Sequence, residues 1–114
     1  MDHKLPEGFT DGPVTDECAR EAVDTINACW RWMNGGALTN FDDFAVEWQM
    51  EGFNRDTDAR IVLTPQGRVI GYADLYDIQA PHVRLDTLVA VHPDFMGLGI
   101  GSFLLEWLIE RGRR

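Results

Sequence analysis

The spacing of hydrophobic residues changes several times along the chain, and each change marks a predicted element. Over residues 19–33 apolar side chains recur every three or four positions, which is the period of a helix with one buried face. Thr15 or Asp16 is placed to cap its start, because their side-chain oxygens accept hydrogen bonds from first-turn amides. Residues 34–36, Asn-Gly-Gly, end the pattern. The sequence therefore predicts an amphipathic helix in the first third of the chain.

Four other segments have the alternation or the short apolar runs of strands. Residues 9–14 predict a short first strand. Residues 61–63 and 69–78, joined by the turn Pro-Gln-Gly at residues 65–67, predict a β-hairpin. Residues 82–91 predict the next strand. The last three strands are therefore expected to pair as an antiparallel meander.

Two further segments have a helical period. Thr39 or Asn40 can cap the first of them. Its apolar stripe consists of Phe41, Phe44, Ala45 and Trp48. The second covers residues 102–109, directly after a glycine-rich segment. The predicted order is strand, two helices, three strands and helix, which belongs to the α+β class.

The segment between the last strand and the last helix contains the most specific pattern in the chain. An apolar run continues to Val91, and Pro93 prevents the strand from extending further. Gly97, Gly99 and Gly101 then follow at alternate positions. The first-turn amides of a helix have no partner within it, the helix dipole adds positive charge, and glycine lets a ligand approach the main chain. The pattern predicts a phosphate-bearing cofactor bound by backbone amides. The alternative is a plain strand-to-helix turn that needs glycine for its geometry.

The residues around these glycines narrow the interpretation. Over residues 85–109, the string Val-x-Val-His-Pro-Asp-Phe, then Gly-x-Gly-Ile-Gly-x-x-Leu-Leu, resembles the acetyl-CoA motif of the GNAT superfamily of N-acetyltransferases. The resemblance implies that the acetyl and pantetheine part of the cofactor contacts Val89, Ala90 and Val91. It implies that the pyrophosphate is bound by the amides of Gly97, Leu98, Gly99, Ile100, Gly101 and Ser102. Met96 stands where the family usually has Arg or Gln, so we expect weaker cofactor binding.

The resemblance also implies a fold and an activity. The fold is α+β, with a mixed, largely antiparallel sheet, helices on both faces and truncation after the third helix. Residues 1–114 would form a single domain, the N-terminal acetyl-CoA-binding part of that fold. The activity is that of a transferase: acetyl-CoA, as co-substrate, donates its acetyl group to an amine of a small molecule or peptide. In the family a fifth strand and a helix with a tyrosine acid follow, so we expect little activity from residues 1–114 alone.

Because the family's fifth strand would follow residue 114, we expect the apolar edge of the strand at residues 82–91 to be unpaired, which favours association with another chain. We expect a homodimer, or a further C-terminal segment, to cover this edge. The alternative function comes from the same feature. The chain would then be a non-catalytic CoA-binding or assembly module that pairs through its open sheet edge.

Candidate residues for proton transfer lie on the last two strands. In many family members a glutamate on the strand before the glycine loop assists deprotonation of the amine. The corresponding position here is near Leu85, so its neighbour Asp86 is the candidate catalytic residue, although neighbouring side chains alternate between strand faces. Tyr72, Asp74 and Tyr76 share one face of the preceding strand and could bind or deprotonate an amine. The commoner explanation of such a face is a polar, solvated side of a hairpin.

Aromatic residues on the first two predicted helices have two interpretations. These helices overhang the acceptor site in the family, so Trp30, Trp32, Phe41 and Trp48 could line a substrate pocket. The alternative is that most of them are core residues. Trp32 lies off the apolar stripe of its helix, so we expect it to be exposed.

Composition limits the remaining possibilities. The 114 residues carry a net charge of −9 with no basic cluster before residues 111–114, which argues against nucleic acid and is compatible with cationic substrates. A membrane-spanning helix needs about 20 consecutive apolar residues, and every apolar run in this sequence is much shorter. No secretory leader is evident either, so the predicted location is cytoplasmic, without membrane contact. Cys18 and Cys29 lie too far apart on one helix to form a disulfide. The histidines have no metal-ligand spacing, so no metal site is predicted.

Overall fold

The structure of the chain is a computed structural model, which describes residues 5–36, 42, 45–46, 48–49, 54–77 and 85–112. Its elements in chain order are β1 (Thr10–Gly12), α1 (Ala19–Asn34), α3 (Arg55–Asp58), β2 (Ala59–Leu63), β3 (Val69–Asp77), β4 (Leu85–Val91), a 3-10 turn (Pro93–Phe95) and α4 (Ile100–Gly112). The predicted strands and the first and last predicted helices are present, and the first strand is shorter than expected. Most of the second predicted helix, and residues 82–84 of the last predicted strand, lie outside the described residues.

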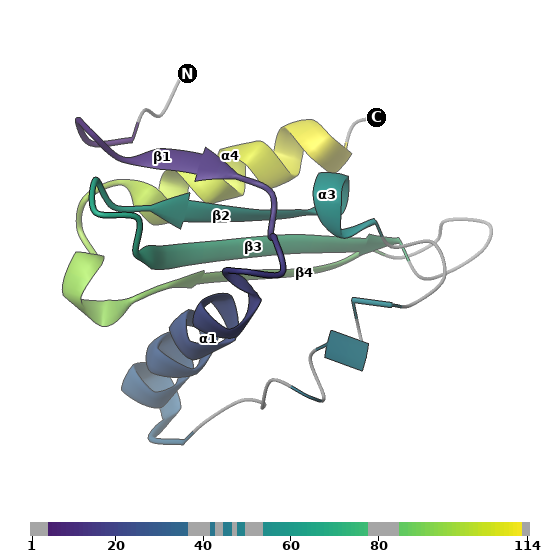
Figure 1. Ribbon diagram of the computed structural model, residues 1–114, viewed down its shortest axis with the longest axis horizontal. Coiled ribbons are helices and arrows are strands. Elements are labelled where there is room, and N and C mark those ends of the chain that lie inside the picture. Colours follow the sequence, from purple (N-terminus) through teal and green to yellow (C-terminus); the bar gives the residue numbers. More distant parts are fainter. Residues whose placement is uncertain are drawn as a thin grey trace.

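The four strands form one antiparallel sheet in the order β1-β2-β3-β4, so each strand pairs with its neighbour in the sequence. The β2–β3 hairpin turns at Gly67, whose φ of +84° is one that glycine adopts without strain. Figure 1 shows α1 on one face of this sheet and α4 on the other. The predicted α+β fold with helices on both faces is confirmed. β4 forms the edge of the sheet next to the glycine loop.

The predicted capping residues of α1 are wrong, whereas its predicted end is confirmed. Gly35 ends the helix with φ +82°. The residue before the helix is Cys18, which makes no side-chain cap hydrogen bond. Neither expected cap is available, because the Thr15 hydroxyl lies 3.2 Å from the Cys18 sulfur and Asp16 forms an ion pair with Arg55 at 2.5 Å. The helix therefore begins at Ala19, and packing of its apolar stripe stabilises it more than capping does.

Two hydrophobic cores lie on the two faces of the sheet because strand side chains alternate between faces. Ile61 packs toward α1 with a cluster that includes Val14, Ala22, Val23, Ile26, Trp48, Tyr72 and Ala90. Val62 packs toward α4 with a cluster that includes Ile70, Ala73, Val91, Ile100, Leu104 and Leu108. The Thr25 hydroxyl also ties α1 to β3 by donating to the Val69 carbonyl at 2.9 Å.

The sheet and α4 approach one another closely at Gly71 of β3. A Cβ atom at this position would lie 3.1 Å from Ile100 and 3.2 Å from Leu104 and Val62. Such separations are tighter than ordinary side-chain contacts, so glycine sets how near α4 lies to the strand. Because Ile100 begins α4, the same contact fixes the height of the glycine loop above the sheet.

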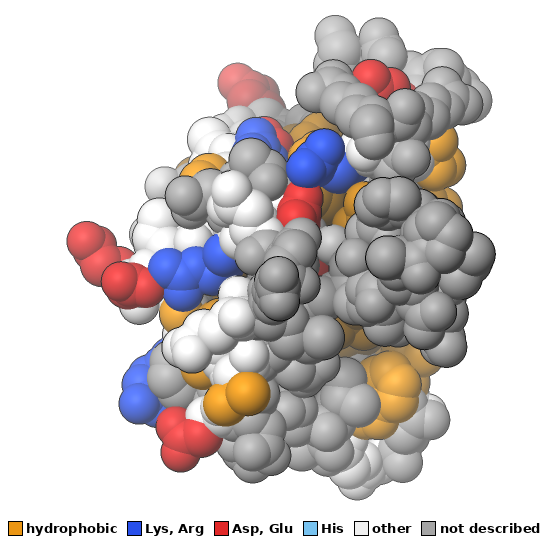
Figure 2. Space-filling model, turned by 90° about the vertical axis from the view of Figure 1, so that its right-hand side faces the viewer, with side chains coloured by type: hydrophobic (Ala, Val, Ile, Leu, Met, Phe, Trp, Pro, Cys, Tyr) orange, Lys and Arg blue, Asp and Glu red, His pale blue; other side chains and the backbone are white. Residues whose placement is uncertain are grey.

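The described surface contains exposed apolar side chains and paired charges. Trp32 is 65% exposed, as predicted, and both cysteines are free, also as predicted. Basic side chains lie beside acidic ones on the face drawn in Figure 2. The ion pairs of the described residues include Arg60–Asp11 and Arg111–Asp58, in each of which the nearest nitrogen and oxygen atoms are 2.7 Å apart. None of the described helices combines the length and the hydrophobicity that a membrane crossing requires.

Candidate functional site

The loop between β4 and α4 presents unpaired amides in a left-handed backbone conformation that glycine adopts without strain. Gly97 and Gly99 have φ values of +87° and +85°, which L side chains rarely adopt. The first hydrogen bond of the helix runs from the Phe103 amide to the Gly99 carbonyl at 3.0 Å. Within the described part of the chain, the amides of residues 97–102 donate no backbone hydrogen bond. These donors and the positive end of the helix dipole can bind an anion.

Side chains fix the turn that precedes this loop. The Asp94 amide donates to Nδ1 of His92 at 3.1 Å, which closes the turn. The Phe95 ring packs edge-on against Phe9, with ring centroids 6.3 Å apart, and the Arg68 guanidinium lies 5.5 Å from the centre of the Phe95 ring. These contacts hold the start of the loop against the end of the sheet.

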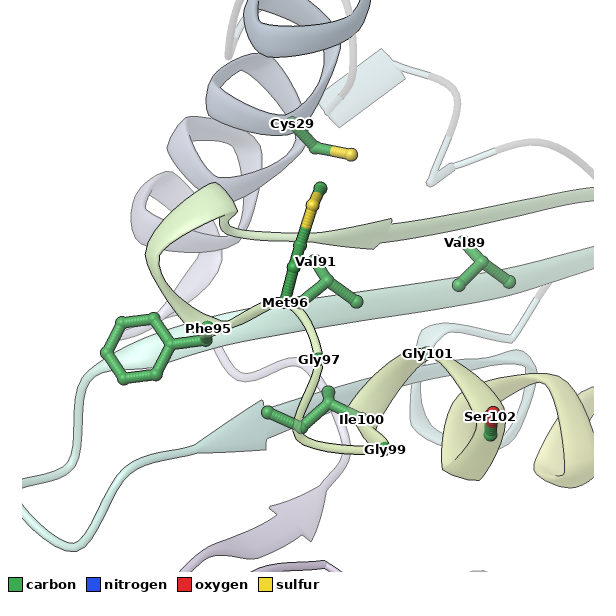
Figure 3. Close-up of a pocket in the computed structure, with 10 residues that line it drawn as sticks. All are labelled: Cys29, Val89, Val91, Phe95, Met96, Gly97, Gly99, Ile100, Gly101 and Ser102. Carbon is green, nitrogen blue, oxygen red and sulfur yellow. The ribbon is translucent and has the colours of Figure 1, made fainter.

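A cavity of about 400 Å³ lies between the glycine loop, the end of β4 and α1 (Figure 3). Seven of the nine residues that the resemblance assigns to the cofactor line it: Val89, Val91, Gly97, Gly99, Ile100, Gly101 and Ser102. The other two, Ala90 and Leu98, do not line it. Ala90 is buried on the α1 face of the sheet, and Leu98 is 47% exposed. The structure thus brings strand and loop residues together around one cavity.

Three residues that sequence reasoning did not assign to the cofactor also line this cavity, namely Cys29, Phe95 and Met96. In Figure 3 the Met96 side chain extends toward Cys29 of α1. Met96 is half-buried and contacts both hydrophobic cores. It therefore acts as a packing residue between α1 and the loop. No local signal in the sequence could place Cys29 here, because α1 reaches the loop only through the tertiary fold.

A buried chain of hydrogen bonds crosses the α1 face of the sheet. The Trp48 indole nitrogen donates to the Tyr72 hydroxyl at 3.0 Å, and that hydroxyl donates to Oδ2 of Asp74 at 2.6 Å. The exposed fractions of these residues are 6%, 0% and 2%. The expectation of a solvated polar face is therefore wrong for Tyr72 and Asp74, because α1 and the segment around Trp48 cover that face. Trp48 is a core residue, as the alternative interpretation of the aromatic residues expected.

The candidate base Asp86 lies within β4, where its backbone pairs with that of Tyr76. The side chains of both residues fall outside the described part of the chain. Its catalytic role stays a prediction. Among the described side chains, no group of three or more His, Cys, Asp or Glu residues is placed to hold a metal ion.

Comparison with known proteins adds to this geometry. A model of the acetyltransferase (GNAT) family matches residues 21–114. The chain belongs to this family. A GCN5-related N-acetyltransferase from Sphaerobacter thermophilus is similar in structure, with a TM-score of 0.83 and 26% sequence identity over 96% of this chain and 34% of that protein. The family match confirms the resemblance to GNAT acetyltransferases that the glycine motif indicated.

Two further structures share the fold at lower identity. One is the acetyltransferase yncA from Salmonella typhimurium, solved with its cofactor acetyl-CoA, with a TM-score of 0.70 and 22% identity over 95% of this chain and 65% of that one. The other is a GCN5-related N-acetyltransferase from Kribbella flavida, with a TM-score of 0.71 and 16% identity over 95% of this chain and 67% of that one. The chain thus spans about a third of the Sphaerobacter protein and about two thirds of the other two. No curated protein matches it.

Proposed function

We propose that the chain forms the acetyl-CoA-binding portion of an N-acetyltransferase, which transfers the acetyl group to an amine. The observation that carries this proposal is the row of unpaired amides at residues 97–102 beside a cavity that ends at the edge strand β4. A Cβ atom at Gly97 or Gly99 would meet no other atom within 4 Å, so the space above these two glycines is open to a ligand. The residues present therefore fit a pyrophosphate.

The chain's own contribution to such a reaction is alignment. Acetyl-CoA supplies an acetyl group that is already activated as a thioester. The loop amides would hold the pyrophosphate, and Val89 to Val91 would hold the pantetheine arm along the edge of the sheet. Fixing the thioester beside a bound amine replaces a bimolecular encounter by an oriented one, which is a large share of the rate enhancement in such transfers. The amine must also lose a proton before it attacks.

We propose in addition that the edge of β4 is covered in the working protein. β4 has a paired neighbour, β3, on one side, and no described strand pairs with its other side. A second copy of the chain, or a segment that follows it, would satisfy the exposed backbone groups. The cytoplasmic location and the amine acceptor stay predictions.

The same edge favours a second candidate function, a non-catalytic module that binds CoA or assembles with another chain through β4. The two functions differ in what bound cofactor does. In the first, acetyl-CoA is consumed when an amine is added, whereas in the second it binds without turnover.

Calorimetric titration with acetyl-CoA, followed by a thiol-release assay over a panel of primary amines, tests both functions. We expect one cofactor to bind per chain, with affinity that falls as salt is raised because the ligand is anionic. Light scattering on the same sample measures the oligomeric state and shows whether copies pair. If neither acetyl-CoA nor CoA gives a binding signal at millimolar concentration, the cofactor site is rejected. If acetyl-CoA binds but no amine in the panel causes release of free CoA thiol, the assembly module is favoured.

A further inference from the structure

His92 lies between the end of β4 and the turn that leads into the glycine loop, and both nitrogens of its ring face N–H donors. Nδ1 accepts a hydrogen bond from the Asp94 amide at 3.1 Å. A guanidinium nitrogen of Arg68, the residue directly before β3, lies 3.2 Å from Nε2. The Phe95 ring packs edge-on against the imidazole, with ring centroids 5.9 Å apart. The β2–β3 hairpin, the end of β4 and the turn therefore meet at this imidazole.

A neutral imidazole suits these surroundings, and a protonated one does not. The neutral ring has one nitrogen that can accept, and here that nitrogen accepts from the Asp94 amide. Its single proton is then on Nε2, so the contact with Arg68 is one between a neutral group and a cation. Both nitrogens of the protonated ring carry hydrogens. Protonation therefore sets two donors against each other at Nδ1 and places a second positive charge beside the guanidinium.

The Asp94 carboxylate offers the protonated ring a different partner. Its Oδ2 atom lies 3.8 Å from Nδ1, which is too long for a hydrogen bond but close enough to become one after a small movement of either side chain. The charged groups of the described residues that contact the ring thus act in opposite directions, Arg68 against protonation and the carboxylate in favour of it. The ring has one preferred arrangement when neutral and another when charged.

The turn connects this ring to the cofactor cavity. Among the described residues no backbone carbonyl accepts from the Asp94 amide, so the ring nitrogen is the acceptor that closes the start of the turn. Phe95 follows in the turn, lines the cavity and packs under the Arg68 guanidinium as well as against the imidazole (Figure 3). Met96 and Gly97 come next and line the same cavity. Release of the Asp94 amide and of Arg68 therefore loosens the residues from which the glycine loop begins.

We propose that His92 positions the glycine loop through this turn and does so only when its ring is neutral, so that acidification weakens binding of acetyl-CoA. The proposal rests on the proposed function, which gives the loop to the pyrophosphate. A charged ring also attracts an anion at longer range, but salt screens that attraction, whereas the contacts at 3.1 and 3.2 Å act directly on the ring. Histidine gains its charge between about pH 8 and pH 5, so the effect is expected in that range.

The first test needs no cofactor. In ¹⁵N-labelled chain without ligand, the amide signals of Asp94 and Gly97 are followed from about pH 7.5 to about pH 5.5. We expect both to shift with one common midpoint. His92→Asn is the deciding variant, because an Asn side-chain oxygen accepts from the amide two residues later and gains no charge. The extended backbone of residue 92, with φ −57° and ψ 134°, also suits Asn before a proline. In this variant the common shift should be absent.

Calorimetric titration with CoA at the same two pH values gives the second readout. The phosphate of CoA also takes up a proton in this range, so each variant is compared with the parent at the same pH. At the higher pH we expect His92→Asn to bind CoA as the parent does, and His92→Ala, which offers no acceptor, to bind about fivefold more weakly. At the lower pH the parent should bind about fivefold more weakly than His92→Asn, close to His92→Ala.

Each outcome separates this proposal from the cofactor site. A Gly97 signal that stays still while the Asp94 amide responds to pH would show that the ring is not coupled to the loop, and the role of His92 would be overturned. Equal losses of affinity in the parent and His92→Asn on acidification, or a gain in the parent alone, would overturn it too. Failure of the parent to bind CoA at either pH would instead reject the proposed function, while the amide signals still report on the loop. If neither variant folds, the two signals of the parent decide.

Discussion

The two polar regions of this chain are built in opposite ways. The glycine loop offers main-chain amides from six consecutive residues, 97–102, at the start of α4. The region on the α1 face is made of side chains: Tyr72 and Asp74 come from β3, and Trp48 comes from a segment 24 residues before Tyr72. The loop borders an open cavity, whereas the side chains are almost fully buried. One site depends on backbone conformation, and the other depends on packing.

This difference determines how each region responds to substitution. A main-chain site keeps its donors whatever the neighbouring side chains are, provided that the backbone can adopt its left-handed turns. A buried side-chain network loses a partner with each substitution, and the groups left behind lie in apolar surroundings. Substitutions in the loop should therefore alter ligand binding most, and substitutions on the α1 face should alter stability most.

Gly99→Val gives the largest expected effect. A Cβ at Gly99 would meet no protein atom within 4 Å, but the valine side chain would fill the space through which the pyrophosphate approaches the loop amides. Valine at a φ of +85° is also strained. We expect acetyl-CoA affinity to fall by about a hundredfold or more, which corresponds to about 2.7 kcal/mol. Gly35→Val is the matched control, because Gly35 has φ +82° with equally open surroundings at the end of α1. It should lose similar stability and keep its affinity for acetyl-CoA. Equal affinity losses in both variants would mean that strain, and not the loop, causes the effect.

Gly71→Ala tests how closely α4 must approach the sheet. The added methyl would be 3.1 Å from Ile100, so α4 has to move outward, and we expect the free energy of unfolding to fall by about 1–2 kcal/mol. Because Ile100 begins α4, acetyl-CoA affinity should fall as well. Gly12→Ala in β1, where a Cβ meets nothing within 4 Å, is the control and should be close to neutral. Urea denaturation and calorimetry measure the two quantities, and a stable Gly71→Ala variant with parental affinity would contradict the prediction.

Tyr72→Phe addresses the side-chain region alone. Removing the hydroxyl leaves the Trp48 indole N–H and the Asp74 carboxylate without the partner they share, so we expect a stability loss of about 1–2 kcal/mol. Acetyl-CoA affinity should change less than twofold, about 0.4 kcal/mol. A double-mutant cycle with Asp74→Asn should give a coupling energy of about 1 kcal/mol, and additive losses would show that the two groups do not act together.

Met96→Arg should give the smallest effect and is the one expected gain. The longer arginine side chain can extend its guanidinium from this position to the bound phosphates. Affinity for acetyl-CoA should therefore rise by a few-fold at low salt, about 1 kcal/mol, and this gain should shrink as salt is raised. Loss of the packing between α1 and the loop should lower stability slightly. Leu98→Arg adds the same charge at an exposed loop residue that does not line the cavity, and should improve affinity less. Equal gains would mean that general electrostatic attraction is responsible.

The sequence by itself determined the parts of this protein that depend on neighbouring residues. The period of the apolar stripe predicted α1, the alternation and the turn at residues 65–67 predicted the hairpin, and the glycine spacing predicted where a strand gives way to a helix start. The family could be recognised for the same reason, because a main-chain anion site requires glycines at fixed local spacing. Seven of nine assigned residues then meet at one cavity, since strand and loop are contiguous in the chain.

Only the tertiary structure decided which polar residues are buried and what covers them. Alternation correctly put Tyr72 and Asp74 on one face, but a period of two cannot tell a solvated face from one that α1 covers. The packing of Met96 toward Cys29 and the hydrogen bond from Trp48 to Tyr72 likewise join residues far apart in sequence. The physical reason is that backbone conformation is set largely by local sterics and hydrogen bonding, whereas burial is set by the sum of contacts from elements that meet only once the chain has folded.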